Sequence, residues 1–469
     1  MFLIIFFSVY GFMHLYFIKK LKLAFNISSK FLYLILMMTL SPAFYKYYDK
    51  LGYDNYHMSL FILLWMGFIM LFFLYYLFVD IYHFILKISE RILKHNPLPH
   101  ISSFKGFIFI TVLTLSSMAY GYYETLNLKI YKFEIYSAKI KRDIKILHIS
   151  DLHLNQVMRE DKINLVLDVY HKEKPDIVIS TGDLVDGYVL NKESYIKLLN
   201  QMNPPLGKYA ILGNHEYYND VNQAIEFTKK AGFKVLIDEA FSIQDLAFVG
   251  VDDKEAERFK IRKLIPEKEL FKSVDDSKFV IFLKHQPKLD NDLIDKFDLM
   301  LAGHTHGGVL WPVKFILRKI FITDAGFLKI NNSYIFISRG IGTGGPPIRI
   351  GCPPDMAIFY IKSPSRWNYP PGGEEVSIMR KVLNIINQSW NTFGQKLAKF
   401  KKRSFGLQFK DDKENESRGN PWIAITKESE NLEVKYCHYE AAQRIFYFYW
   451  ISRLTYELKY YKNQSSNVK

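Results

Sequence analysis

The chain has 469 residues, more than one compact domain usually holds, and a formal net charge of +15 at pH 7. Its two cysteines, Cys352 and Cys437, exclude a disulfide framework, and neither lies in a CxxC or Cys/His zinc pattern. Part of the Lys and Arg excess lies beside apolar stretches, which favours attraction to anionic lipid head groups over nucleic-acid binding.

Residues 1–125 are predicted to form a transmembrane region. Four stretches of this region are mostly apolar: 2–18, 31–45, 59–79 and 104–122. A helix that crosses the hydrocarbon core needs about 20 mostly apolar residues, and 59–79 meets this requirement most clearly. The stretch 31–45 is short and contains Ser41 and Pro42, so it also suits a re-entrant or interfacial segment. We therefore expect three or four membrane spans.

Basic residues follow both the first and the fourth apolar stretch, so the orientation in the membrane stays open. Under the positive-inside rule, three spans leave the following domain in the cytoplasm and four spans leave it outside. In residues 80–95 apolar and charged side chains recur at helical spacing. This pattern predicts an amphipathic helix on the membrane surface, or a short helix packed on the domain. We expect a multi-pass protein of the cell's inner (plasma) membrane.

Residues 141–362 are predicted to form a soluble α/β domain in which polar side chains follow one strand after another. Five predicted strands end just before such a cluster: 144–150, 176–180, 209–212, 279–283 and 298–302. The clusters have the patterns DxH (Asp151, His153), GDxxD (Asp183, Asp186), GNH (Asn214, His215), a lone His285, and GHTH (His304, His306). Ligands of open α/β sheets bind beyond the carboxyl ends of the strands, so we expect these side chains to converge.

The ordered set of motifs resembles that of the calcineurin-like metallophosphoesterase family, which runs DxH, GDxxD, GNH, a lone His and GHxH. The resemblance covers roughly residues 144–362. It implies an α/β fold, a four-layer sandwich of two mixed sheets flanked by helices, which here follows an all-α transmembrane region. It also implies an enzyme, namely a dinuclear-metal phosphohydrolase with phosphodiesterase or pyrophosphatase activity.

The resemblance implies roles for individual side chains. Seven positions match the family's metal ligands: Asp151, His153 and His306 for the first ion, Asn214, His285 and His304 for the second, and Asp183 as the bridge. His215 would hydrogen-bond the phosphate or protonate the leaving group, and Asp186 would orient His215. Carboxylate and amide oxygens with imidazole nitrogens, and no thiolate, suit two divalent ions of Mn, Fe or Zn and argue against a closed structural zinc.

A narrower resemblance lies at residues 338–355, which are similar to the closing segment of the membrane-associated bacterial branch of this family. That branch includes UDP-diacylglucosamine pyrophosphatases. It carries Gln after GHTHGG, whereas this chain has Val309, a departure that touches no metal ligand and puts a substrate contact in doubt. In the same segment, Arg339 and Arg349 are expected either to contact a substrate phosphate or to pair with surface acids.

The leading interpretation is hydrolysis of a phosphodiester or pyrophosphate bond in a lipid-linked substrate such as UDP-2,3-diacylglucosamine, a lipid A precursor. The membrane and this lipid-linked phosphate are the expected partners, no nucleic acid is expected, and the oligomeric state stays open. The apolar run 311–327 either holds acyl chains or is an ordinary hydrophobic strand and helix. The alternatives are a nuclease or nucleotide phosphodiesterase, which the net charge favours, and a non-catalytic membrane scaffold, which the complete ligand set disfavours.

Residues 364–469 are predicted to be a basic and aromatic C-terminal extension that is partly disordered. Prolines and glycines in 364–375 predict a linker, whereas 376–397 and 441–461 are candidate helices. The charged stretch 411–419 is expected to be disordered. No chemistry is predicted for this extension, and we prefer contact with the membrane over packing as a small appendage.

Overall fold

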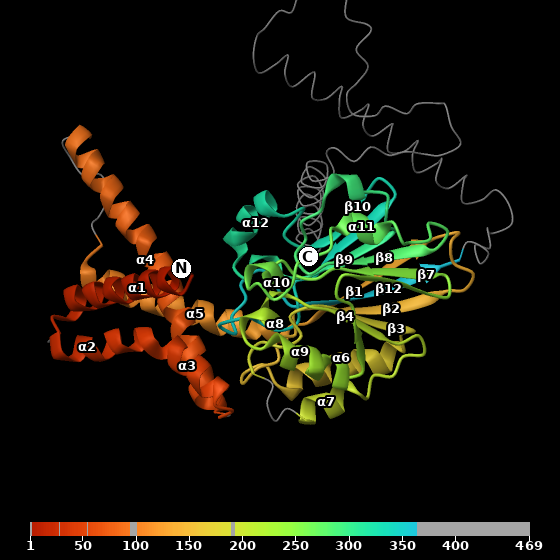
Figure 1. Cartoon of the computed structure of the whole chain (residues 1–469). Coiled ribbons are helices and arrows are strands. Elements are labelled where there is room, and N and C mark those ends of the chain that lie inside the picture. Colours follow the sequence, from red (N-terminus) through yellow and green to blue (C-terminus); the bar gives the residue numbers. More distant parts are fainter. Residues whose placement is uncertain (1, 28, 54, 94–100, 189–192, 364–469) are drawn as a thin grey trace, which may run out of the picture. The chain divides into compact units, whose positions relative to one another are not determined.

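The computed structural model describes residues 2–27, 29–53, 55–93, 101–188 and 193–363 (Figure 1). The predicted C-terminal extension, with its linker and its two candidate helices, lies outside the described residues.

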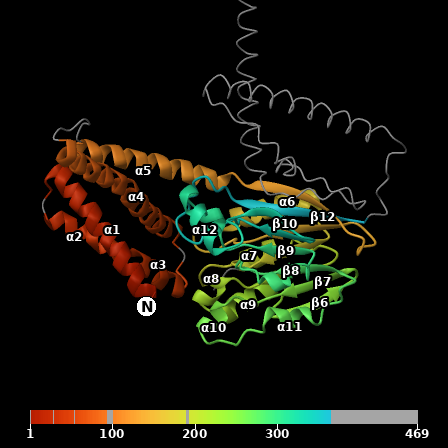
Figure 2. The ribbon, with the colours of Figure 1, turned by 90° about the horizontal axis from the view of Figure 1, so that it is seen from above.

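The first part of the chain is helical. Its elements are α1 (Phe2–Phe25), α2 (Ser29–Met37), η1 (Met38–Leu40), α3 (Ser41–Lys50), α4 (Tyr56–Leu93) and α5 (Ser103–Leu126). The side chains of Phe17, Phe72 and Phe107 join α1, α4 and α5, with ring centroids 4.9 Å apart for Phe17–Phe72 and 5.4 Å for Phe72–Phe107. Figure 2 shows these three helices side by side.

Among the described residues, three helical stretches are long and apolar enough to cross a membrane: Leu3–Phe25, Tyr56–Ile92 and Ser103–Leu126. The predicted stretch 31–45 is not one of them, because it is divided among α2, η1 and α3, with Pro42 in the first turn of α3. Residues 80–93 are helical, as expected, but they do not form a separate surface helix. They are the C-terminal part of the continuous helix α4.

The first sheet has the strand order β1-β12-β2-β3-β4-β5. Its strands are β1 (Lys129–Tyr136), β2 (Ile144–Ile149), β3 (Ile177–Thr181), β4 (Lys208–Ile211), β5 (Phe233–Val235) and β12 (Asp355–Lys362). Strands β2 to β5 are parallel, whereas β12 runs antiparallel to β2. Its outer face is covered by α6 (Glu160–Glu173), α7 (Glu193–Leu199) and α9 (Val221–Lys230), whose apolar side chains share one buried cluster with this face.

The second sheet has the strand order β10-β11-β9-β8-β7-β6. Its strands are β6 (Glu239–Ile243), β7 (Leu246–Gly250), β8 (Phe279–Leu283), β9 (Leu299–Ala302), β10 (Gly326–Ile330) and β11 (Ser333–Ile337). Strands β7, β8, β9 and β11 are parallel neighbours, and the edge strands β6 and β10 pair antiparallel. The shorter elements around it are α8 (Asn214–Tyr218), α10 (Glu255–Arg258), α11 (Glu267–Phe271), η2 (Asn291–Leu293), η3 (His306–Gly308), η4 (Trp311–Val313) and α12 (Lys314–Ile320).

The main hydrophobic core lies between the two sheets. Inward side chains of the first sheet, such as Ile146 and Ile179, share a buried cluster with Phe248 and Ile281 of the second sheet. The outer face of the second sheet has its own cluster, which includes Leu270 of α11. Two mixed sheets packed face to face, with helices outside, confirm the predicted fold class.

The first sheet begins earlier in the chain than the predicted domain boundary at residue 141. Strand β1 pairs in parallel with β12 along its whole length, from Lys129 opposite Asp355 to Tyr136 opposite Lys362. Two residues separate α5 from β1, so the last candidate span leads directly into an edge strand of the domain. The lysines of β1 follow an apolar stretch, and in the sequence they indicate a basic segment beside the membrane and not a strand.

Two glycines let the helical region approach the α/β domain closely. A Cβ atom at Gly67 of α4 would lie 2.6 Å from Cδ1 of Ile348, and one at Gly121 of α5 would lie 2.4 Å from its Cγ2. The backbone N–H of Arg349 donates to the carbonyl oxygen of Gly121 at 3.0 Å. The side chain of Ile348 therefore packs against glycines of two candidate membrane spans, and at Gly121 an added Cβ would also crowd the backbone of Arg349.

Gly121→Val is expected to destabilise the protein, because its new methyl groups would overlap Ile348 and force the following loop outward. Overpacking of this kind costs about 1–3 kcal/mol, which corresponds to a fall in Tm of about 5 °C. The measurement is thermal unfolding of the full chain in detergent. Gly11→Val in α1, where a Cβ meets nothing within 4 Å, is the matched control. Equal Tm values for the two variants would contradict the close contact.

Candidate metal centre

The predicted site residues all lie just beyond strand ends. Asp151 and His153 follow β2, Asp183 and Asp186 follow β3, Asn214 and His215 follow β4, His285 follows β8, and His304 and His306 follow β9. These strands are parallel within their sheets, so their carboxyl ends point the same way. The polar residues that follow the strands of both sheets therefore lie at one edge of the sandwich.

The first group of ligand atoms comprises Asp151, His153 and His306. Nε2 of His306 lies 3.0 Å from Nε2 of His153 and 3.4 Å from Oδ1 of Asp151. Oδ2 of Asp183 lies 3.6 Å from Nε2 of His153. These nitrogen and oxygen atoms face one another in a buried space, which is the arrangement that a divalent cation between them would satisfy.

The second group shares Asp183 with the first. Nε2 of His285 lies 3.2 Å from Oδ2 of Asp183 and 3.0 Å from Oδ1 of Asn214. Nδ1 of His304 lies 2.8 Å from the same Asn214 oxygen. The structure therefore brings all seven predicted ligands together in two adjacent groups, with Asp183 between them.

The donors fit a pair of divalent cations. Asp151 and Asp183 are almost completely buried, with exposed fractions of 0% and 1%. Burial raises the pKa of Asp151 to about 6, and the carboxylate of Asp183 adds to this effect, although His285 opposes it. Ligand oxygens of Asp151 and Asp183 lie within 4.8 Å of each other. Two buried carboxylates at this separation are unfavourable without compensating positive charge, and bound cations would supply that charge.

His215 and Asp186 form a hydrogen-bonded pair beside the ligands. Nδ1 of His215 lies 2.7 Å from Oδ1 of Asp186, so the carboxylate holds the proton on Nδ1 and fixes the ring. Burial opposes the charged form of His215, but the carboxylates of Asp186 and Asp183 outweigh it and raise the pKa of His215 to about 9. A cationic His215 can donate from Nε2 to a phosphate or leaving-group oxygen, which is the predicted role.

Five of the ligand residues have backbone conformations that only glycine adopts freely. The φ angles are positive at Asp151 (49°), His153 (49°), Asp183 (51°), His304 (72°) and His306 (49°). Left-handed backbone at non-glycine residues costs energy and is concentrated at functional sites. The sequence does not indicate this strain, because Asp and His, unlike Gly, are not characteristic of a positive φ angle.

Neighbouring glycines allow the ligand loops to close on one another. A Cβ at Gly213 would lie 2.2 Å from Oδ1 of Asp183, and a Cβ at Gly303 would lie 2.2 Å from Oδ2 of Asp151. Any larger residue at these positions would displace a ligand.

Glu216 is a positioning residue that had no predicted role. Its buried carboxylate accepts hydrogen bonds from the backbone N–H groups of Gly213 (2.8 Å), Asp183 (3.0 Å) and Val185 (3.2 Å). It thereby ties the loop after β3 to the loop after β4. The available signal was its place at the third residue of α8, where an acidic side chain often caps a helix.

The structure corrects the expectations for Arg349, and for Arg339 it shows that the paired acid is buried. Arg349 is fully buried and donates from Nη2 to the carbonyl oxygens of Gly342 (2.6 Å) and Arg339 (2.8 Å), so it cannot reach a substrate phosphate. The same Nη2 lies 3.1 Å from Nδ1 of His306. Arg339 pairs with Asp355 at 3.2 Å, and this acid is buried and not at the surface. Both side chains fix the glycine-rich loop of residues 338–345, which lies beside the metal centre.

Comparisons with known proteins agree with this geometry. Residues 144–308 match the family model of the calcineurin-like phosphoesterases. An uncharacterized metallophosphoesterase of Aquifex aeolicus is 47% identical over 260 residues, which cover 54% of this chain and 98% of the relative. A zebrafish (Danio rerio) transmembrane protein with a metallophosphoesterase domain is 26% identical over 281 residues, covering 55% of this chain and 63% of that protein. A dimetal phosphatase from Danio rerio has a TM-score of 0.31 and 11% identity, covering 47% of this chain and 93% of that structure.

The fold, the ligand groups, the matching family model and the Aquifex aeolicus relative define a phosphohydrolase that depends on divalent metal ions. The chain belongs to the calcineurin-like metallophosphoesterase family.

Proposed function

We propose that this enzyme cleaves a phosphodiester or pyrophosphate bond in a lipid-linked substrate at the surface of the inner (plasma) membrane. Two divalent ions of Mn, Fe or Zn would be held by the seven predicted ligands: Asp151, His153, Asp183, Asn214, His285, His304 and His306. When bound, such a pair offsets the charge of the phosphate and lowers the pKa of a water molecule. His215 then donates from Nε2 to the phosphate or the leaving oxygen, and Asp186 keeps that ring in place.

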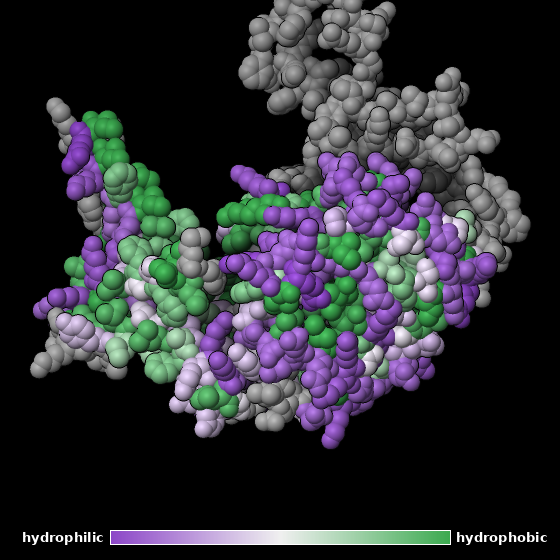
Figure 3. All heavy atoms as spheres, viewed as in Figure 1, coloured by the Kyte–Doolittle hydropathy of each residue, from purple (hydrophilic) through white to green (hydrophobic). Residues whose placement is uncertain are grey.

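The observation that carries the lipid assignment is the exposed apolar surface of η4 and α12. Trp311, Phe315, Ile316 and Ile320 have exposed fractions between 50% and 58%. Figure 3 shows apolar atoms gathered at the position of α12, with hydrophilic atoms beside them. An exposed cluster of large apolar side chains is unfavourable in water and suits insertion at a bilayer surface. Lys314 and Lys319 suit anionic head groups.

This apolar surface is linked both to the metal centre and to a candidate membrane span. His306 begins η3, and η4 starts only five residues later at Trp311. Leu310, between the two, is buried in one cluster with Leu71 of α4 and Ile348. A lipid held at α12 therefore has a short path to the ligand His306. Of the two predicted alternatives for the apolar run 311–327, this arrangement supports contact with acyl chains.

The test compares a lipid with a soluble substrate. The full chain in mixed micelles with Mn²⁺ is assayed with UDP-2,3-diacylglucosamine, following release of UMP, and with bis-(p-nitrophenyl) phosphate. We expect the double variant Phe315→Asp and Ile316→Asp to lower the ratio of lipid to soluble turnover about tenfold, because two buried apolar contacts with the lipid are lost. Ile265→Asp, at an exposed apolar residue outside α12, is the control.

An unchanged ratio in the double variant would contradict the lipid assignment. Turnover of bis-(p-nitrophenyl) phosphate without UMP release would support phosphodiesterase activity and exclude UDP-2,3-diacylglucosamine as the substrate. Other phosphate-containing lipids would then be tested. Cleavage of single-stranded DNA that weakens steeply with salt would favour the nuclease alternative.

A further inference from the structure

A chain of three hydrogen bonds leads from the core between the two sheets to the predicted ligand Asp151. Nε2 of His148, on β2, lies 2.8 Å from Oγ1 of Thr181, the last residue of β3. The same Oγ1 lies 2.8 Å from Oγ of Ser150, which in turn lies 2.5 Å from Oδ2 of Asp151. All four side chains are buried, with exposed fractions of 0% or 1%. His148, Ser150 and Thr181 have no predicted role.

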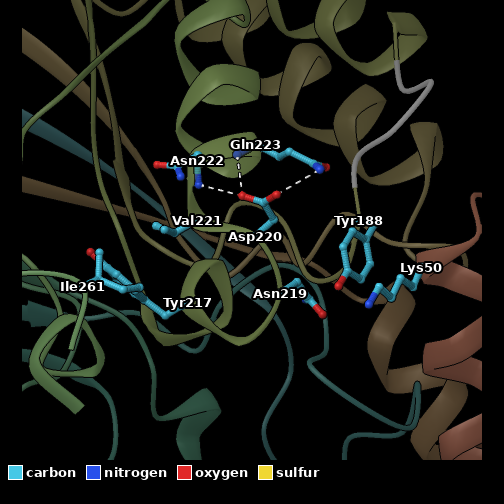
Figure 4. Close-up of a pocket in the computed structure, with 9 residues that line it drawn as sticks. All are labelled: Lys50, Tyr188, Tyr217, Asn219, Asp220, Val221, Asn222, Gln223 and Ile261. Atoms are coloured by element: carbon cyan, nitrogen blue, oxygen red, sulfur yellow. Dashed lines mark hydrogen bonds between the residues drawn. The ribbon is translucent and has the colours of Figure 1, made fainter. Parts of the chain in front are cut away.

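These three side chains are too deeply buried to touch a substrate. The ring of His148 packs edge to face against Phe336 of β11, with ring centroids 5.6 Å apart. The surface cavity of about 580 Å³ that Figure 4 shows is lined by other residues, among them Asp220 beside α9. Any influence of the three side chains on hydrolysis must therefore pass through Asp151.

The direction of each hydrogen bond in the chain follows from the number of protons available. An ionised carboxylate only accepts, so the single hydroxyl proton of Ser150 must point at Asp151. The contact between Ser150 and Thr181 then uses the hydroxyl proton of Thr181, and the contact between Thr181 and His148 requires a proton on Nε2 of His148. Nδ1 of His148 accepts no hydrogen bond from any residue that the structure describes. Burial lowers the pKa of His148 to about 3, so the ring is a neutral donor with its proton on Nε2.

The hydroxyl group of Ser150 distinguishes the two oxygen atoms of Asp151. It donates to Oδ2, whereas Oδ1 lies 3.4 Å from Nε2 of His306 and 3.9 Å from Nε2 of His153, within the first ligand group. The backbone N–H of His304 lies 3.0 Å from Oδ1 and 3.1 Å from Oδ2, so it favours neither. The hydrogen bond from Ser150 thus leaves Oδ1 as the oxygen that faces a bound cation.

From these contacts we infer that His148, Thr181 and Ser150 are positioning residues, whose chain of donors orients Asp151 and sets the affinity of the first cation. Replacing a hydrogen-bonded partner behind a metal ligand typically lowers metal affinity or activity about 10–100-fold. The carbonyl oxygen of Thr181 also accepts from Nδ1 of His285 at 2.7 Å, but this backbone contact stays when the side chain is replaced. The inference rests on the proposed metal ligands and is independent of the lipid substrate.

The test compares two substitutions of Thr181 that differ in one hydroxyl group. Thr181→Val keeps nearly the same shape but neither donates to Ser150 nor accepts from His148, whereas Thr181→Ser keeps the hydroxyl group. The full chain is purified in detergent and stripped with a chelator, and free Mn²⁺ is followed by electron paramagnetic resonance during a titration. We expect Thr181→Val to bind one of the two ions about 10–100-fold more weakly than wild type, and Thr181→Ser to bind both within about threefold of wild type.

Further variants remove the two ends of the chain. His148→Leu lacks the first donor and Ser150→Ala lacks the last, so each should weaken the binding of one ion, as Thr181→Val does. Thr228→Val is the matched control, because Thr228 is another buried threonine, whose hydroxyl group donates to the carbonyl oxygen of Ala224 in α9 at 2.8 Å. At saturating Mn²⁺, kcat of Thr181→Val for bis-(p-nitrophenyl) phosphate should return to within about threefold of wild type, because the chain acts on cation binding.

Wild-type affinity for both ions in Thr181→Val and His148→Leu would overturn the inference, as would an equal loss of affinity in Thr181→Ser. A kcat of Thr181→Val that stays low when both ions are bound would also overturn it, because that result would assign Thr181 a purely structural role. If Thr181→Val does not fold, the same titration of Ser150→Ala and His148→Leu provides the test. Wild type that binds fewer than two Mn²⁺ ions is a separate outcome, which would overturn the proposed ligands together with this inference.

Discussion

Asp183→Asn is expected to lower kcat for bis-(p-nitrophenyl) phosphate by about three orders of magnitude, or ~4 kcal/mol in the activation free energy. The physical reason is that one carboxylate serves both ligand groups. Its Oδ2 lies 3.2 Å from Nε2 of His285 and 3.6 Å from Nε2 of His153. The amide has nearly the same shape but no charge, so both cations lose their shared anionic ligand.

The matched control for this prediction is Asp168→Asn, at an exposed acid of α6. It makes the same chemical change away from the metal centre and should keep wild-type turnover. Initial rates are measured in detergent with Mn²⁺ in excess. If Asp183→Asn kept more than a tenth of the wild-type kcat, Asp183 would not be the bridging ligand.

His215→Asn should lower kcat by a factor of about 10²–10⁴, the range for a positioned acid or base, while KM stays within about threefold. The ring of His215 is held by Asp186 at 2.7 Å and is not one of the seven proposed ligands, although its nitrogen atoms also lie near His153 and Asp186 in a group that could hold a cation. Its loss should therefore affect proton donation without releasing metal. The measurement combines steady-state kinetics with metal analysis of the purified variant.

His171→Asn serves as the control for that variant, because His171 is an exposed residue of α6. Metal loss in His215→Asn would show that His215 supports the ligands, and an unchanged kcat would remove it from the mechanism.

Much of the metal centre could be predicted because its residues follow strand ends in a fixed order. The strands before Asp151, Asp183, Asn214 and His285 were apparent as short apolar runs, and each run is a strand in the structure. Once these strands are parallel neighbours, the residues after them must meet at one edge. Order along the chain thus carried information about position in space.

Other features depend on tertiary contacts and could not be predicted. Arg349 lies in a glycine-rich segment, where an arginine often contacts a phosphate at the surface. It is buried here because its guanidinium group donates to backbone carbonyls of that loop. Gly67 and Gly121 lie in candidate spans, and only the position of Ile348 shows why they are glycine. The change from the apolar stretch 59–79 to an amphipathic pattern after residue 80 likewise indicates a separate helix, whereas both segments belong to α4.

The most direct test of a centre with two metal ions bridged by Asp183 is the metal content of the full chain. The protein is purified in detergent, stripped with a chelator, reloaded with Mn²⁺ and analysed by mass spectrometry, beside Asp183→Asn. The structure predicts two equivalents of metal per chain in wild type, with hydrolysis lost on chelation and restored on reloading, and fewer than one equivalent in the variant. Full hydrolysis by the metal-free chain, or at most one equivalent in active wild type, would contradict it.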